Sequence, residues 1–223
     1  MKAKIWSLFF AMGLLALAAQ GQDSFTCTTN SGSITITGYT GTDAVVEIPA
    51  LINGYPVTEI AVSAFYSNSV IESVVMPDTV TSFPNGSLQS RAIFVPDGIA
   101  YEYWYDGVFA GCINLTNVVL SGSLTNIGAG AFYGCSKLPG ITIPAGVVHI
   151  GNVAFYECTN LTSVTFLGNA PAAANQGATY ANPSLVFKDV PATVYYYYPA
   201  TGFGEDYLGR PAVELGIPFN YTV

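Results

Sequence analysis

The chain has 223 residues, of which 51% are hydrophobic and only 9% are charged, with 14 acidic and six basic residues and a net charge of −8. This length suffices for one domain with a substantial core. The acidic excess makes nucleic acid and anionic membranes poor partners, because both would repel the chain. With so few charges, the surface must consist largely of Ser, Thr, Asn, Gly and Tyr, which suits an exported protein.

Residues 1–21 have the pattern of a secretory signal peptide. Lys2 and Lys4 precede an apolar stretch over residues 5–19, and small residues provide cleavage sites after Ala18 or Gly21. The stretch is short for a membrane span of about 20 residues, although an uncleaved anchor is the alternative. Cleavage would leave four basic and 14 acidic residues, a net charge near −10 (4 − 14). We therefore expect a secreted or cell-surface protein without a transmembrane span in the mature chain.

Three series of residues recur with a period of 23 in the second half of the chain. They are Phe109, Phe132 and Phe155; Cys112, Cys135 and Cys158; and Leu115, Leu138 and Leu161. A fixed period of this size predicts a solenoid, in which each repeat buries its apolar side only against its neighbours. A solenoid offers a long exposed surface and therefore favours a binding function.

The clearest repeat covers residues 138–158. Its Leu-x-x-Ile-x-Ile-Pro segment predicts a short strand with alternating inward residues, ended by a proline that cannot donate a ladder hydrogen bond. A second segment, Val-x-x-Ile-Gly, leads to a tight turn, and Ala-Phe-x-x-Cys follows. The phenylalanines are expected to stack in one column. The cysteines are expected to be free and buried, because equivalent Cβ atoms point the same way, although turn-to-turn disulfides are the alternative.

The spacing between Phe65 and Phe109 is 44, two residues short of two periods. We prefer to explain it by a pair of degenerate turns, with Ile93, Val95 and Pro96 as the strand of a hidden repeat. The rival explanation is one repeat that carries a loop from Pro84 to Gly107.

The second half of the unit, Ile-Gly-x-x-Ala-Phe-x-x-Cys, resembles the BspA-like (treponemal) bacterial cell-surface leucine-rich repeat over about residues 44–170. Val108 departs from the pattern where alanine is usual, and the stretch between Ile71 and Gly107 loses several signature residues. The resemblance implies a leucine-rich-repeat solenoid, a right-handed horseshoe coil of about six turns with a parallel β-sheet and little helix. It also implies an extracellular or surface protein whose curved sheet recognises other molecules. It implies no enzymatic role, and it carries over no site residues.

The flanks are predicted to be caps, residues 22–43 at the N-terminal end and residues 171–223 at the C-terminal end. Two alternating segments about Asn30-Ser31-Gly32 predict a β-hairpin. The last repeat is expected to break down at Ala170-Pro171. Residues 193–198, with four consecutive tyrosines, are expected to form a strand over the last turn.

Residue types that carry chemistry are sparse. The single histidine, His149, falls at an outward position of its repeat, and no Cys/His spacing predicts a metal site. Asp97, Glu102 and Asp106 lie in an aromatic stretch, where a solvated loop or degenerate turn is the simpler interpretation than a glycosidase-like acid pair. We expect no catalytic, cofactor-binding or metal-binding residues, no cofactor, and a monomer.

The outward positions of the predicted sheet are the main candidates for binding. The candidate residues are Glu72, Ser73, Thr116, Asn117, Thr142, Thr162, Ser163 and Thr165. They predict a non-enzymatic recognition or adhesion module that binds a protein or a surface polymer. The alternative is a carbohydrate-binding protein that uses the aromatic cluster Tyr101, Tyr103, Trp104 and Tyr105 or the tyrosines of residues 195–198.

Overall fold

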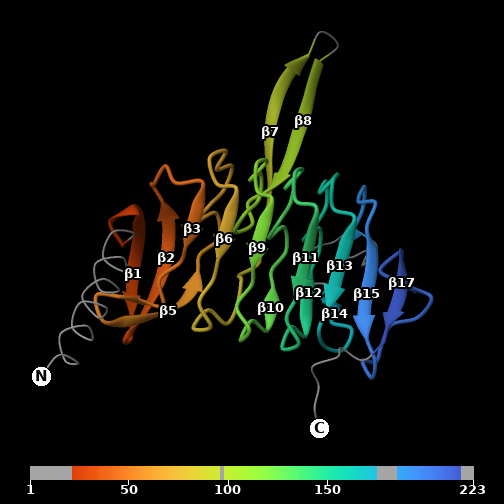
Figure 1. Cartoon of the computed structure of the whole chain (residues 1–223). Helices are drawn as coiled ribbons and strands as arrows, with labels where there is room; N and C mark the ends of the chain where they lie inside the picture. The colour runs from red at the N-terminus through yellow and green to blue at the C-terminus, as the bar shows by residue number, and fades with distance from the viewer. Residues whose placement is uncertain (1–21, 96–97, 175–184, 217–223) are drawn as a thin grey trace, which may run out of the picture.

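A computed structural model describes residues 22–95, 98–174 and 185–216, with the backbone alone at residues 22, 93–95, 98–103 and 173–174. Short strands stack side by side along one axis from the N-terminal to the C-terminal end, and one hairpin stands out from this stack (Figure 1). The predicted leucine-rich-repeat solenoid is confirmed. The predicted signal peptide lies outside the described residues. Within them the helix η1 (Gln22–Ser24) is a single turn, and no helix is long and apolar enough to cross a membrane.

The first parallel ladder runs along the whole stack. Its strands in order are β3 (Val45–Glu47), β6 (Ser73–Val75), β9 (Asn117–Val119), β11 (Gly140–Ile143), β13 (Ser163–Phe166), β15 (Thr193–Tyr197) and β17 (Arg210–Leu215). β3, β6 and β9 form one hydrogen-bonded sheet, β11 to β17 form another, and β9 lies beside β11. The strands predicted for the regular repeats are therefore observed, with Gly140 opposite Ser163 one period later.

A second ladder closes the other side of the coil. It contains β2 (Ser33–Tyr39), β5 (Tyr55–Ile60), a single bridge residue at Ser82, β10 (Asn126–Ile127), β12 (His149–Gly151) and β14 (Ala172–Ala174). β4 (Leu51–Ile52) pairs with β5 in an antiparallel turn. The apolar residues of both ladders point into one continuous core.

A column of aromatic rings runs through this core. Ring centroids lie 4.9 Å apart for Phe65 and Phe109, 5.5 Å for Phe109 and Phe132, 5.3 Å for Phe132 and Phe155, and 5.4 Å for Phe155 and Phe187. All four pairs are stacked, at interplanar angles of 19° or less. The spacing is close to the strand separation of about 4.8 Å, because each turn contributes one ring per rung of the ladder.

The three periodic cysteines are buried free thiols, as predicted. Each Sγ donates a hydrogen bond to the carbonyl of the phenylalanine in the preceding turn: Cys112 to Phe65 at 3.0 Å, Cys135 to Phe109 at 3.2 Å, and Cys158 to Phe132 at 3.0 Å. Burial raises the pKa of the Cys112 and Cys158 thiols to about 12 and that of Cys135 well above its usual value. The thiols therefore hold neighbouring turns together in their protonated form.

The preferred explanation of the 44-residue spacing is wrong. β7 (Leu88–Val95) and β8 (Gly98–Tyr105) pair with each other in antiparallel register, and β6 pairs directly with β9. The rival explanation, one turn that carries an insertion, is the correct one. The strand-like residues 93–95 followed by a proline imitate a repeat, but the backbone at these positions pairs within the hairpin because each β7 residue has a β8 partner at close sequence distance.

The two ends of the coil differ in how well they were predicted. β1 (Phe25–Asn30) and β2 form the predicted antiparallel hairpin. At the other end the coil continues past residue 170, because β14 and β15 extend both ladders and Phe187 stacks on Phe155. Pro171 does not break the coil, since it precedes β14. The short strand β16 (Asp206–Tyr207) pairs with β17 at the end of the described chain, and residues 175–184 and 217–223 of the predicted cap lie outside the described residues.

Candidate recognition surface

The outward residues of the first ladder form two parallel rows, which we call the sheet face. Inward neighbours such as Val74, Val118 and Val164 are buried, so the residues on either side of them point away from the core. The pairing register of each hydrogen-bonded sheet, and the 23-residue period between β9 and β11, set the order within the rows. One row is Val45, Ser73, Asn117, Gly140, Ser163 and Thr193; the other is Glu47, Val75, Val119, Thr142, Thr165, Tyr195 and Val213.

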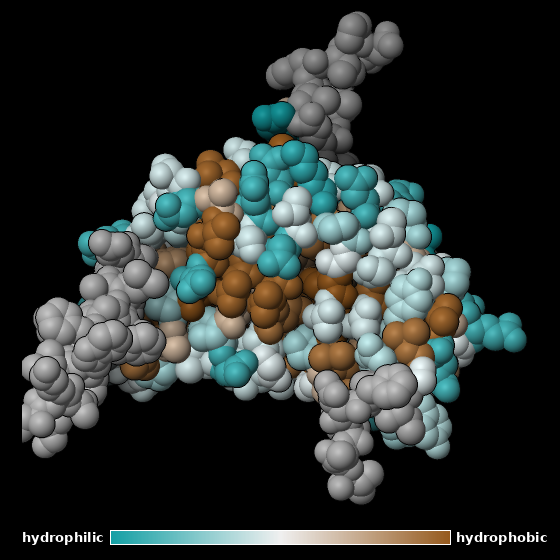
Figure 2. Space-filling model, in the orientation of Figure 1, coloured by the Kyte–Doolittle hydropathy of each residue, from teal (hydrophilic) through white to brown (hydrophobic). Residues whose placement is uncertain are grey.

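The chemistry of the sheet face changes along the coil. Over β3, β6 and β9 it alternates valines with Glu47, Ser73 and Asn117, and Val45 is 61% and Val119 is 47% exposed. Hydrophobic side chains gather over the middle of the face at these strands (Figure 2). Over β11 and β13 the outward residues are Thr142, Ser163 and Thr165, so the surface becomes rich in hydroxyl groups.

The structure brings most of the predicted residues to this surface. Ser73 and Asn117 are cross-strand neighbours, and the Asn117 Nδ2 donates to the Ser73 Oγ at 2.9 Å. Thr142 and Thr165 are also directly opposite each other.

Thr116 and Thr162, two of the predicted binding residues, also have a structural role. The Thr116 hydroxyl donates to the Glu72 carbonyl at 3.0 Å, and the Thr162 hydroxyl donates to the Pro139 carbonyl at 3.1 Å. Both hydroxyls satisfy backbone groups at the start of a strand. The sheet face is therefore centred on Thr142, Ser163 and Thr165, with Thr116 and Thr162 at its edge.

The predicted aromatic cluster lies on the β7–β8 hairpin and is divided between its two faces. Consecutive strand residues lie on opposite faces, so Trp104, opposite Gln89, does not share a face with Tyr105, opposite Leu88. Tyr105 is half-buried against the coil, where its ring lies 5.9 Å from that of Tyr133. The side chains of Tyr101 and Tyr103 lie outside the described part of the structure. The hairpin thus offers no single surface that joins the four aromatic residues.

A row of tyrosines on another side of the coil was missed in the sequence. The rings of Tyr133 and Tyr156 stack at 5.4 Å, Tyr105 lies against Tyr133, and the Lys188 Nζ lies 5.5 Å from the Tyr156 ring centroid. Burial, and then the nearby Glu157 carboxylate, raise the pKa of Tyr133 to about 12. The signal was available, because a tyrosine follows the periodic phenylalanine in several repeats. The rings cover each other's faces, so this row presents ring edges and hydroxyls.

The described His, Asp and Glu side chains considered in the sequence analysis lie apart from one another or have structural partners. No group of three or more His, Cys, Asp or Glu side chains among them could hold a metal ion. His149 is exposed on β12, as its outward position predicted. The Asp106 carboxylate accepts hydrogen bonds from the Ser87 backbone and hydroxyl and from the Gln89 amide, and so it anchors the hairpin. Asp97 and the Glu102 side chain lie outside the described residues.

Comparison with known proteins agrees with this geometry. The family model of the BspA type leucine rich repeat region matches the chain in six copies, over residues 21–93 and 98–196. The chain belongs to this family. The interruption of the match, at residues 94–97, falls at the far end of the inserted hairpin.

Solved structures support the same fold. A leucine-rich repeat protein of T. pallidum (TpLRR) is 26% identical at a TM-score of 0.60, over 78% of this chain and 69% of that one. The pneumococcal vaccine antigen PcpA is 17% identical at a TM-score of 0.50, over 78% of this chain and 43% of that one. No curated protein matches the chain. As a BspA-type repeat protein, the chain is a module of a kind that generally serves interaction or adhesion and not catalysis.

Proposed function

We propose that this BspA-type chain is an exported recognition module that binds a protein or a surface polymer through its sheet face. The observation that carries the proposal is the pair of outward rows along the first ladder, which combine exposed valines on β3 and β9 with neutral hydroxyl groups on β11 and β13. Apolar patches of this kind mark interaction sites in soluble proteins. Short hydroxyl side chains add hydrogen bonds at a small cost in side-chain entropy.

Substitution of two threonines in the middle of the sheet face by arginine tests this proposal. In the variant Thr142→Arg/Thr165→Arg, two long cations replace directly opposed threonines and would prevent a partner from approaching the strands. The control is Val148→Arg/His149→Arg, which adds two arginines at exposed positions on the second ladder. Both proteins, and the unchanged chain, would be immobilised and used to capture partners from surface extracts. The proposal expects capture to fall at least tenfold for the first variant alone; equal capture by all three would contradict it.

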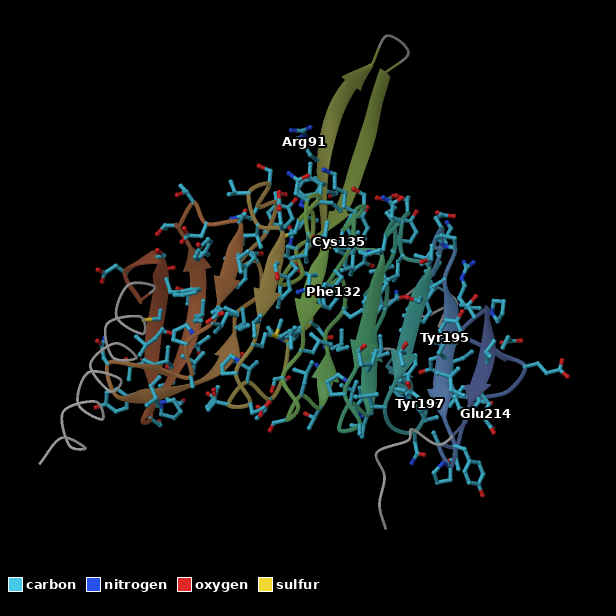
Figure 3. The ribbon with its side chains drawn as sticks, in the orientation of Figure 1. Arg91, Phe132, Cys135, Tyr195, Tyr197 and Glu214 are labelled. Carbon is cyan, nitrogen blue, oxygen red and sulfur yellow. The ribbon has the colours of Figure 1, made fainter. Side chains whose placement is uncertain are left out.

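A glycan is the second candidate partner, and the C-terminal end of the sheet face favours it. Tyr195 and Tyr197 are both outward residues of β15, two positions apart, with Thr165 and Val213 on the strands to either side of Tyr195 (Figure 3). Tyrosines on one face of a strand can stack on sugar rings, and the adjacent hydroxyl can bind sugar oxygens. The variant Tyr195→Ala/Tyr197→Ala would then lose capture, and periodate oxidation of the extract would abolish capture by the unchanged chain. Capture that survives oxidation would assign the partner to protein.

A further inference from the structure

The inserted hairpin of β7 and β8, which we call the arm, stands clear of the coil (Figure 1). Its eight residue pairs run from Leu88 opposite Tyr105 to Val95 opposite Gly98. Among the described strands, β7 and β8 hydrogen-bond only to each other. An isolated two-stranded ribbon is at best marginally stable in water, whereas three or more strands can be stable. The arm therefore lacks the further strands that a sheet of this length normally has.

The base of the arm is held firmly on the coil. The Ser63 hydroxyl donates to the Asp106 carbonyl at 3.0 Å, and the Asp106 carboxylate holds Ser87 and Gln89. The Tyr105 side chain packs so closely over Gly130 that a side chain at residue 130 would collide with it. The arm is therefore presented in a defined direction, as a surface for another molecule would be.

The alternation of hydrogen bonds between β7 and β8 shows which backbone N–H and C=O groups of β7 are not bonded to β8. The Asp106 N–H donates to the Ser87 carbonyl, so these two residues form a hydrogen-bonded pair. Antiparallel pairs alternate, so the N–H and C=O groups of Leu88, Ser90 and Ala92 point away from β8. The side chains of residues 90–92 are exposed, and Leu88 at the base is 52% exposed. Its partner Tyr105 is half-buried against the coil, so at the base of the arm β7 is the more accessible edge.

Charge does not prevent a second copy of the chain from pairing at this edge. The coil is acidic and would repel another coil, but Arg91 is the one charged residue of β7, and it lies directly opposite Glu102 of the same arm. Eight residues at about 3.4 Å make the arm about 27 Å long. The screening length at physiological ionic strength is only about 8 Å. Two antiparallel arms can thus pair along their length while the acidic coils at their bases stay farther apart than the screening length.

We propose that two copies of the chain join through the β7 edges of their arms and form a four-stranded sheet in the order β8, β7, partner β7, partner β8. The N–H and C=O groups that point away from β8 must face the same groups of the partner, so even-numbered residues of one β7 pair with even-numbered residues of the other. A two-fold axis at Arg91 would place two arginines side by side, which is unfavourable. An axis at Ala92 moves the two arginines from directly opposite to diagonal positions and pairs residues 89–95, the longest remaining register. The interface is symmetric, as in most homodimers. This inference is independent of the function proposed for the sheet face.

Cysteine cross-linking tests the register. In the variant Ala92→Cys the two introduced residues form a hydrogen-bonded pair across the two-fold axis, with Cα atoms about 5.5 Å apart, within the range of a disulfide. In the matched variant Ser90→Cys the two copies of residue 90 are four rungs apart along the strands, too far to bond. The chain, expressed from its full sequence and purified after export, would be oxidised mildly and analysed on non-reducing gels. We expect a covalent dimer for Ala92→Cys alone, while the unchanged chain and Ser90→Cys stay monomeric on the gel.

Sedimentation measures the association without any introduced cysteine. Residues 88–105 would be replaced by Asn-Gly, which closes a two-residue hairpin loop between Ser87 and Asp106. An interface this small belongs to the weak class, so the measurement would extend to about 100 µM. The proposal expects a dimer for the unchanged chain and a monomer for the replacement. A monomer for the unchanged chain at all concentrations, a dimer for the replacement, or equal cross-linking of Ser90→Cys and Ala92→Cys would overturn it.

Discussion

The turn that carries the arm and the regular turns that follow it differ greatly in length but not in their interior. Phe65 and Phe109 are 44 residues apart in sequence, and Phe109 and Phe132 are 23 apart. Their rings nevertheless stack at 4.9 Å and 5.5 Å, and the β6–β9 ladder passes the insertion without a gap. The coil is thus determined by which residues point inward. The length of chain between them matters little, provided that an insertion leaves and returns at adjacent points, as it does at Ser87 and Asp106.

The largest effect is expected from removing a ring of the column in the regular turns. Phe132 is fully buried between two stacked rings, so Phe132→Ala should lower the free energy of unfolding by about 3–5 kcal/mol. Phe109→Ala, at the border with the arm-bearing turn, should cost as much if that turn is equivalent. Urea denaturation would measure both, with the exposed Tyr66→Ala as the control. A cost below about 1 kcal/mol for Phe109→Ala alone would show that the column is interrupted at the insertion.

Close backbone contacts between turns should give the next largest effect. An added Cβ would overlap the Gly130 carbonyl in Gly107→Ala and the Ala129 backbone in Gly151→Ala. Each change should destabilise the chain by about 1–3 kcal/mol, since packed backbones cannot separate without distorting the ladder. Gly216→Ala, with no atom near the added group, is the control. If Gly107→Ala were neutral and Gly151→Ala were not, the arm-bearing turn would be more loosely packed than the regular turns.

Alkaline pH should weaken the column of thiols. The pKa of Cys158 is raised to about 12 in the folded chain, from its ordinary value of 9.0, because burial disfavours the thiolate. The folded state therefore holds its proton to higher pH, so the contribution of Cys158 is complete below about pH 9 and is lost as pH rises towards 12. By pH 9.5 the loss should be about 0.8 kcal/mol.

Urea midpoints at pH 7.5 and 9.5 would measure the drop in unfolding free energy between the two pH values. In Cys158→Ala this drop should be smaller by the amount that Cys158 contributes. Cys112→Ala, in the turn after the arm, should act alike, because the pKa of Cys112 is also raised to about 12. An unchanged pH dependence in both variants would show that the thiols do not contribute.

The smallest effect on stability is expected from removing the arm. Since β7 and β8 hydrogen-bond to no other described strand, replacement of residues 88–105 by Asn-Gly should change the unfolding free energy of the monomer by less than about 1 kcal/mol. Thermal unfolding at low protein concentration would measure this change. A loss of several kcal/mol would mean that the arm is part of the coil after all.

Features that recur were predictable from the sequence, and features that occur once were not. The first-ladder strands, the ring column and the buried thiols each follow from one residue type at one register. The arm was missed because residues 93–96 imitate a repeat strand and its proline, and its true partner strand lies outside the repeat pattern. The strand predicted at residues 193–198 is observed as β15, but the turn that leads to it was missed, because Phe187 comes 32 residues after Phe155 and thus falls out of register.

On the sheet face, the outward direction of the strand residues was predictable, whereas the contacts that depend on the loops were not. Strand alternation predicted that Thr142, Ser163 and Thr165 point outward, and the structure places them side by side. That the hydroxyls of Thr116 and Thr162 bind carbonyls of the adjacent turn depends on the path of the loops before the strands. Alternation within β8 could also have separated Trp104 from Tyr105, but only once that segment was known to be a strand.

Recognition by the sheet face is best tested by titrating the captured partner, in solution, against three proteins: the unchanged chain, Thr142→Arg/Thr165→Arg, and the chain with residues 88–105 replaced by Asn-Gly. A partner free in solution removes the contribution of avidity from a dimer. We expect the replacement to bind within about threefold of the unchanged chain and the arginine variant to bind at least about tenfold more weakly, a difference of about 1.4 kcal/mol. Weak binding by the replacement, together with full affinity in the arginine variant, would show that recognition takes place on the arm and not on the sheet face.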